Sequence, residues 1–212
     1  MMVKPDPEVT EVRMDSPEMQ IARGSVITDK DGTRQATLLI PAGTKLEGLS
    51  HATLHLRATE YTVGEKGPQA MPAELPPQVG YTYCVELSAD ETEEVRFDRP
   101  VYFYVENFLN FPVGTPVPVG YYDRVKGVWV PSQNGRVILI VGINDGLAQV
   151  DLDGSGAPAG EEGLNEIGFT EDELRKLAEL CPVGQSLWRV PITHFTPWDC
   201  NWPYGPPAGA EA

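Results

Sequence analysis

Apolar and polar residues alternate in several short segments of this chain. In residues 52–57 (Ala-Thr-Leu-His-Leu-Arg) and again in residues 81–87, every second side chain is apolar or aromatic. This two-residue period is typical of strands with one buried face. Residues 101–105 (Val-Tyr-Phe-Tyr-Val) are apolar or aromatic on both faces, which indicates a more central strand. Because Gly, Pro, Asn and Asp separate such segments, we expect a mainly β fold, with an antiparallel β-sandwich over residues 21–110.

A second group of strand patterns follows residue 110. Residues 111–120 are rich in Pro and Gly, which predicts a joint between modules or an irregular edge. Tyr121-Tyr122 and residues 128–130 flank a turn, and Asn134-Gly135 predicts a tight hairpin that leads into residues 136–141. We therefore expect a small β-meander over residues 111–204. The pattern leaves open whether the two halves form one domain or two.

The remaining segments have a different composition. Residues 1–20 combine prolines with acidic residues, so we expect an extended acidic arm. Residues 66–77 contain four prolines and are expected to form a long connection, and residues 205–212 are expected to form a tail.

One short helix is predicted after residue 169. Thr170 and Glu173 have the spacing of a capping box, and Phe169 and Leu174 have the spacing of a hydrophobic staple. The apolar residues that follow share one helical face, and Pro182 and Gly184 end the segment. A helix of about three turns is expected.

The charge balance is strongly acidic. The chain has 31 acidic and 16 basic residues and a formal net charge of −15. Its basic residues form no cluster that could follow a phosphate backbone, so nucleic acid is not an expected partner. The longest apolar run, residues 137–141, is far too short to span a membrane. Residues 1–6 lack the apolar stretch of a secretory signal, so these residues do not themselves specify export.

Residues 151–162, which we call the Asp151 loop, fit the twelve-residue pattern of an EF-hand calcium loop. Calcium prefers six to eight oxygen ligands, and this spacing can arrange them around one point. The pattern assigns the side chains of Asp151, Asp153 and Ser155, the backbone carbonyl of Ala157 and the carboxylate of Glu162 to the ion. Gly156 occupies the position of the sharp turn. We therefore predict that Ca²⁺ binds to these five residues.

Two features distinguish the Asp151 loop from a paired EF-hand. A strand pattern precedes it, and Pro158 stands where paired loops use a backbone N–H. We expect a solitary structural site with an affinity on the order of 10⁻⁴–10⁻³ M, as in extracellular modules. The alternative is an acidic surface loop, because Asp-Gly-Ser-Gly is also common in turns.

The cysteines and histidines suggest further hypotheses. A disulfide between Cys181 and Cys200 and three unpaired buried thiols both remain compatible with the sequence. His194 is in phase with apolar residues of the last strand, which favours a core histidine. The alternative is self-cleavage at Phe195-Thr196, since His-Phe-Thr is similar to the cleavage motif of ZU5 and GAIN domains. That resemblance makes Thr196 the nucleophile and His194 the base.

No other catalytic motif is present in the sequence, so we do not expect an enzyme. Four aromatic residues near the C-terminus raise the alternative of a carbohydrate-binding or surface-adhesion module. These residues are equally consistent with a hydrophobic core or a docking surface. They are Trp188, Trp198, Trp202 and Tyr204.

Two family resemblances extend these expectations. Residues 24–106 are similar to a ZU5-type β-sandwich through the turn Ile40–Gly43 and the strand Phe97–Val101. The last hundred residues resemble the region that precedes the repeats of bacterial RHS (YD-repeat) proteins. This resemblance rests on Pro118–Asp123, Gly127–Pro131, the Asp151 loop, Gln185–Pro191, His194–Asp199 and Asn201–Pro203.

The RHS resemblance implies a role and a location. RHS proteins, relatives of the teneurins and of toxin-complex shells, enclose a C-terminal effector in a hollow β-shell. The resemblance implies that this chain is part of a larger RHS-type polypeptide, in which it leads into or plugs the shell. It also implies a bacterial protein that is secreted or displayed on the cell surface. The chain has no Tyr-Asp repeats of its own, so the shell function itself is not carried over.

Overall fold

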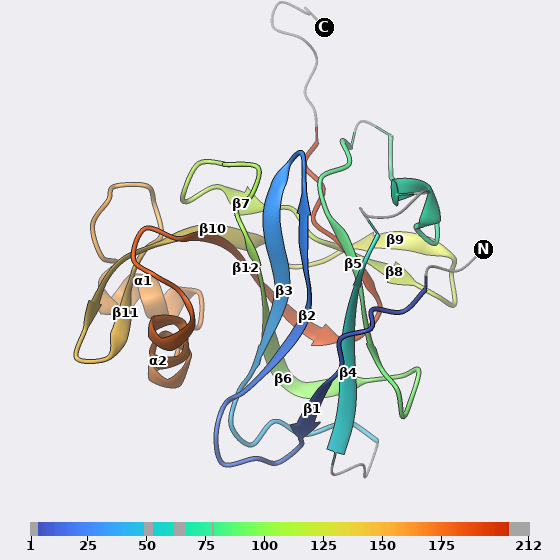
Figure 1. Ribbon diagram of the computed structural model, residues 1–212, viewed down its shortest axis with the longest axis horizontal. Helices are drawn as coiled ribbons and strands as arrows, with labels where there is room; N and C mark the ends of the chain where they lie inside the picture. Colours follow the sequence, from blue (N-terminus) through green and yellow to red (C-terminus); the bar gives the residue numbers. More distant parts are fainter. Residues whose placement is uncertain (1–3, 49–52, 62–66, 78, 204–212) are drawn as a thin grey trace, which may run out of the picture.

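The computed structural model describes residues 4–48, 53–61, 67–77 and 79–203. It confirms the predicted fold class: the described chain is mainly β, with two antiparallel sheets in a sandwich-like arrangement and two helices at one side (Figure 1). A short 3-10 helix, η1 (Gly67–Ala70), lies in the proline-rich connection.

Sheet A has six strands and sheet B has seven. In spatial order, sheet A consists of β1 (Thr10–Arg13), β4 (Thr53–Glu60), β5 (Cys84–Ala89), β13 (Pro197–Asp199), β8 (Gly120–Asp123) and β9 (Val128–Pro131). Sheet B consists of β11 (Leu147–Asp151), β10 (Gly135–Asn144), β12 (Ser186–His194), β6 (Arg96–Glu106), β3 (Gly32–Ile40) and β2 (Gln20–Asp29), and β7 (Pro116–Val117) pairs with β10.

The main hydrophobic core lies between the two sheets. Leu54 and Val85 of sheet A pack in one cluster with Phe103 and Trp188 of sheet B. In β4, Leu54 and Leu56 are buried while the residues between them are partly exposed, as the alternation predicted. Residues 101–105 of β6 are all buried, because both faces of sheet B are covered. The prediction of a central strand there is confirmed.

The outer face of sheet B is covered by the helices α1 (Glu161–Glu166) and α2 (Glu171–Leu180) (Figure 1). Thr170 caps α2 as predicted, because its side chain accepts a hydrogen bond from the N–H of Glu173. The Glu173 carboxylate does not complete the capping box. It binds Arg189 of β12 at 2.8 and 2.9 Å and also accepts from Tyr104 at 2.5 Å.

Arg189 holds α2 against sheet B. Its guanidinium group lies 4.0 Å from the ring centroids of both Tyr102 and Phe169, and it donates to the carbonyl groups of Ile167 and Gly168. Both members of the Arg189–Glu173 pair are buried. A second buried pair, Arg34 with Glu60, connects β3 of sheet B with β4 of sheet A.

Three sequence-based expectations need correction. Residues 10–13 of the predicted acidic arm form β1, because Val12 supplies an apolar side chain to the core. Two helices are present after residue 160 in the described chain where one was predicted, and α1 begins within the last two residues of the Asp151 loop. The helix α1 was missed because its short segment Glu-Glu-Gly-Leu-Asn-Glu contains a glycine and an asparagine. The tight hairpin predicted at Asn134-Gly135 is wrong, because β9 and β10 belong to different sheets.

Strands from residues 21–110 and from residues 111–204 lie together in both sheets. β8, β9 and β13 extend the sheet that begins with β1, β4 and β5, and β10, β11 and β12 extend the sheet that contains β2, β3 and β6. The meander expected after the sandwich is therefore built into the sandwich, and residue 110 does not separate two cores.

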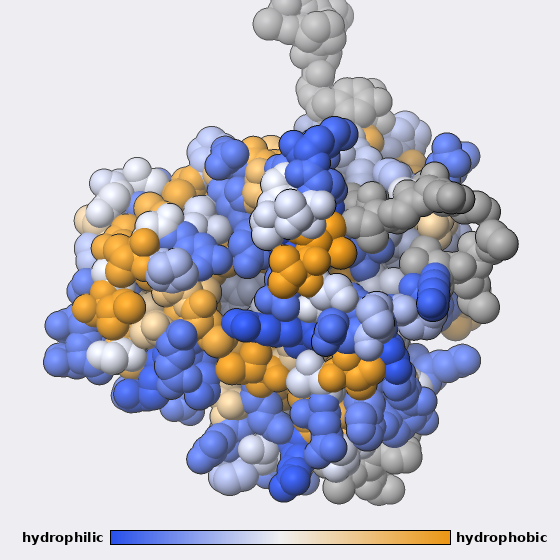
Figure 2. Space-filling view, in the orientation of Figure 1, coloured by the Kyte–Doolittle hydropathy of each residue, from blue (hydrophilic) through white to orange (hydrophobic). Residues whose placement is uncertain are grey.

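The surface view shows small apolar groups among hydrophilic residues. On the face drawn in Figure 2, the hydrophobic residues form separate groups and not one continuous patch. The large hydrophobic residues exposed in the described chain are Val9, Val26, Val125, Val128, Ile143 and Val183.

Candidate functional sites: the Asp151 loop and the His194 pocket

The Asp151 loop is organised by the carboxylate of its first residue. Asp151 is the last residue of strand β11 and the first residue of the loop, and it is 1% exposed. Its carboxylate accepts hydrogen bonds from the backbone N–H groups of Asp153, Gly154 and Gly156, at 3.0, 2.9 and 2.8 Å. Both glycines have positive φ, of 82° and 76°, so the tight turn predicted for Gly156 is present.

The following residues continue this winding. Asp153 accepts from the N–H of Ser155 at 2.9 Å, and hydrogen bonds from Ser155 lower the pKa of the Asp153 carboxyl group. Ser155 in turn accepts from the N–H of Ala157 at 3.3 Å, and the N–H of Ala159 returns to the carbonyl of Val150 at 2.7 Å. The loop is therefore closed by its own backbone and side chains.

Four of the five predicted calcium ligands lie in this winding, and the fifth lies apart. Asp153, Ser155 and Ala157 line a cavity of about 350 Å³, together with Glu166 of α1. Glu162 is exposed on the first turn of α1 and does not line this cavity. Within the described ranges, no three His, Cys, Asp or Glu side chains are grouped so that they could hold a metal ion.

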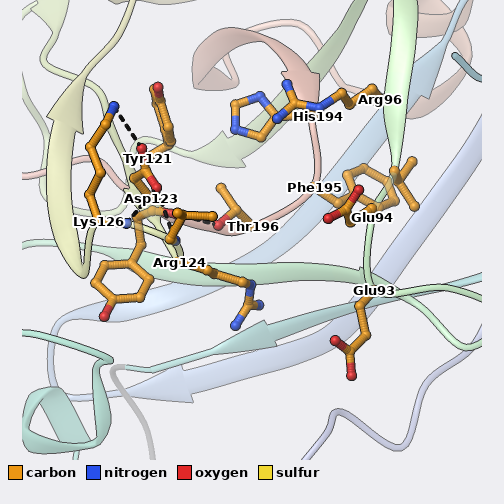
Figure 3. Close-up of a pocket in the computed structure, with 13 residues that line it drawn as sticks. Glu93, Glu94, Arg96, Tyr121, Asp123, Arg124, Lys126, His194, Phe195 and Thr196 are labelled. Atoms are coloured by element: carbon orange, nitrogen blue, oxygen red, sulfur yellow. Dashed lines mark hydrogen bonds and ion pairs between the residues drawn. The ribbon is translucent and has the colours of Figure 1, made fainter.

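A second cavity of about 350 Å³, the His194 pocket, lies where the chain passes from sheet B to sheet A. It is lined by residues 93–96, 121–126 and 194–196 (Figure 3). These residues come from the start of β6, from the β8–β9 turn and from the crossover between β12 and β13. The pocket contains both residues of the self-cleavage hypothesis, His194 and Thr196.

The two residues are not joined by a hydrogen bond in this pocket. Thr196 is buried and donates its hydroxyl to the carbonyl of Tyr122 at 2.7 Å. Nδ1 of His194 lies 3.4 Å from the hydroxyl of Thr193, and its ring packs against the rings of Tyr121 and Trp198, with centroids 4.8 and 5.0 Å away. Attack by Thr196 would first require its hydroxyl to leave Tyr122 and reach His194.

The environment also sets the charge of His194. Burial, and to a smaller degree the positive charge of Arg96, lower the pKa of the imidazole. The ring is therefore neutral near pH 7. Sequence reasoning placed His194 in the core, but the side chain is half-buried and lines the pocket.

The three cysteines are unpaired. Cys200 is buried in the core between the sheets, whereas Cys181 packs in the cluster on the outer face of sheet B, at the end of α2. The two residues thus lie on different sides of that sheet. This arrangement agrees with unpaired thiols and not with the disulfide alternative.

The aromatic residues near the C-terminus do not form a surface platform in the described chain. Trp188 and Trp198 are buried in the core, and Trp202 stacks on Phe111 with ring centroids 3.9 Å apart. Tyr204 lies outside the described residues. These contacts agree with the interpretation of the described aromatic residues as part of the hydrophobic core.

Sequence reasoning missed several residues that line the His194 pocket. Glu93, Glu94 and Arg96 have no motif spacing, so only the folded chain brings them together with His194.

No match was found when the chain was compared with models of known protein families, with curated proteins and with solved structures. Among the described helices, none has the length and apolar character needed to cross a membrane.

Proposed function

We propose that this chain is a non-catalytic structural module whose Asp151 loop is stabilised by calcium. The observation that carries the proposal is the buried Asp151 carboxylate with its three backbone hydrogen bonds. These bonds wind the loop so that Asp153, Ser155 and the region of Ala157 face a common cavity. A twelve-residue calcium loop takes ligands from its positions 3, 5 and 7, which here are Asp153, Ser155 and Ala157.

Calcium binding would require one further movement. The Glu162 side chain would have to turn toward Asp151 and Asp153 to supply two more oxygens. The ion would then connect the end of β11 with the start of α1. The net charge of −15 favours cation binding at such a position, because it makes the surrounding potential negative.

A melting experiment tests the calcium proposal. At a free calcium concentration about ten times the dissociation constant, binding adds about 1.4 kcal/mol of stability, which raises the melting temperature by about 3–5 °C in a chain of this size. We expect this rise at about 10 mM calcium, which is at least ten times the expected dissociation constant. The rise should be lost in Asp153→Ala, whose exposed side chain makes only local contacts.

Asp172→Ala is the matched control, because Asp172 is exposed and lies outside the loop, on α2. It should retain the full calcium response. An unchanged melting temperature of the unmodified protein at about 10 mM calcium, relative to chelator, would remove calcium from the proposal.

We further propose that the module belongs to an RHS-type polypeptide, in which it leads into the shell or plugs it. The proposal rests on the sequence resemblance alone, and the motifs that carry it fall on strands of the sandwich. Pro118–Asp123 and Gly127–Pro131 contain β8 and β9, whereas Gln185–Pro191 falls in β12 at the centre of sheet B.

The reading frame that contains this chain tests the RHS proposal. Tyr-Asp repeats encoded downstream of residue 212 in the same frame would support it. A frame that encodes no such repeats would contradict it and would leave the calcium proposal untouched.

A further inference from the structure

The His194 pocket contains two kinds of charged residues. Some are neutralised locally: Lys126 pairs with Asp123 at 3.0 Å, and Arg124 pairs with Glu86 outside the pocket. Others have no partner. Within the part of the chain that the structure describes, the side chains of Glu93, Glu94 and Arg96 form no ion pair and no hydrogen bond, although all three line the pocket.

The backbone fixes where the unpaired charges point. Val95 and Phe97 are buried in the core, so the alternating side chains of Glu94 and Arg96 point outward on the same side. Two residues along an extended chain place them roughly 7 Å apart. Figure 3 shows Arg96 beside His194 and Glu94 further along the wall of the pocket, whereas the Glu93 carboxylate is turned away from the other labelled side chains.

Arg96 and His194 together form one end of the pocket. The two residues are register partners in neighbouring strands β6 and β12. Since His194 is neutral, this end carries the single positive charge of Arg96 and an imidazole that can donate or accept a hydrogen bond. Glu94 gives the other end its negative charge, and Glu93 lies beside it with its carboxylate turned away.

We infer that the His194 pocket binds a small zwitterion of the ω-amino acid or lysine type. The carboxylate of the ligand would bind Arg96 and His194, and its ammonium group would bind Glu94. The cavity of about 350 Å³ has the size of a small-ligand site. The ring of Tyr121, which also lines the pocket, offers an apolar surface for the chain between the two charged groups.

The charge of the whole chain supports a zwitterion over a simple ion. A net charge of −15 repels anions, so the charge of Arg96 alone would not retain one. A simple cation would find many other acidic positions on the surface. A ligand with both charges is not repelled as a whole, and it satisfies both ends of the pocket.

An NMR titration of the intact chain tests this inference, with 6-aminohexanoate as the probe. We expect the ring signals of His194 to shift and saturate in the millimolar range. His55, an exposed histidine held by Glu91, serves as the internal reference and should not respond. Hexanoate and hexylammonium each carry only one of the two charges, and they should bind at least about tenfold more weakly, as expected for the loss of a charge-assisted contact.

The substituted side chains are all exposed, so we expect each variant protein to keep its fold. A melting curve of each variant verifies this. Arg96→Gln and Glu94→Gln should each weaken 6-aminohexanoate binding about tenfold. Arg99→Gln and Glu47→Gln change the same charges outside the pocket and should bind normally. The inference is overturned by the absence of a saturable His194 shift, by equal binding of hexanoate or hexylammonium, or by unchanged binding in Arg96→Gln.

Discussion

The Asp199 carboxyl group is buried in the middle of sheet A, and none of the described residues provides it with a basic partner. It stands between Cys84 of β5 and Gly120 of β8, and the residue is 8% exposed. A Cβ atom at Gly120 would lie 2.9 Å from the Asp199 carboxylate, so only glycine leaves room for it there. Burial raises the pKa of Asp199 to about 6, although the N–H of Gly120 opposes this shift.

This raised pKa makes stability depend on pH. As the pH rises from about 4 to about 6, the unfolded carboxyl group loses its proton while the folded one keeps it. The free energy of unfolding therefore falls in this window. Since one pKa unit corresponds to about 1.4 kcal/mol, we expect Asp199→Asn to be about 1–3 kcal/mol more stable than the unmodified protein at pH 7. Near pH 4 the two should be equally stable. Urea unfolding at both pH values measures the difference, and a constant difference would contradict the assignment.

Substitution of Asp199 is expected to stabilise the protein, whereas substitution of one member of the buried Arg189–Glu173 pair is expected to destabilise it. Side-chain exposure is 3% for Arg189 and 0% for Glu173, so Glu173→Gln leaves a buried guanidinium group without its counter-charge. We expect a loss of about 3–5 kcal/mol in the free energy of unfolding. Glu171→Gln removes an exposed pair with Arg175 one turn away and should cost less than about 0.5 kcal/mol. Equal effects of the two substitutions in urea would show that the buried pair does not hold α2.

Local spacing explains which of these residues could be predicted. The winding of the Asp151 loop depends on residues two to five positions apart, so its turn and its first ligands could be read from the sequence. Arg189 lies 16 residues from Glu173 and 85 from Tyr104, and such partners have no local signature. Sequence reasoning missed the pocket wall formed by Glu94 and Arg96 for the same reason. The opposite wall of the His194 pocket comes from a strand crossover that is about a hundred residues away in the sequence.

At the scale of elements, two similar turn signals have different outcomes. Asp145 and Gly146, with φ values of 49° and 76°, connect β10 and β11 in a hairpin. Asn134-Gly135 instead leads from sheet A into sheet B. Gly135 lies so close to β12 that an added Cβ atom would be 2.4 Å from the carbonyl oxygen of Arg189. Here glycine permits close backbone approach, which the dipeptide pattern alone cannot distinguish from a hairpin turn.

Substitution of glycine by alanine tests this role of Gly135. We expect Gly135→Ala to reduce the free energy of unfolding by about 1–3 kcal/mol, because β10 and β12 must separate to accommodate the methyl group. Gly163→Ala is the control: its Cβ would meet only Ala159 at 4.0 Å, and alanine favours the helix α1. That control should be neutral or slightly stabilising. A neutral Gly135→Ala in chemical denaturation would contradict the close approach.

At the scale of the whole molecule, the order of strands in each sheet differs from their order in the sequence. β6 pairs with β3 on one side and with β12 on the other, and β13 lies between β5 and β8. The alternation of apolar residues predicted the strands, their faces and the class of fold, because these depend on nearby residues. It could not predict that both halves share two sheets, since strand pairing joins residues far apart in the chain.

The shared sheets imply that residues 21–110 and 111–203 unfold together. We expect the slowest-exchanging amides of β3, β6 and β12 to open with one common free energy in native-state hydrogen exchange, and to respond equally to low concentrations of urea. Amides of α2 provide an internal comparison, because a helix on the outer face can open at lower free energy without separating the sheets. If β3 and β6 kept their protection after β12 had exchanged, the two halves would be separate cooperative units. A single unfolding free energy is expected because unfolding of residues 111–203 would remove β12 from β6 and would open the core that Trp188 shares with Phe103.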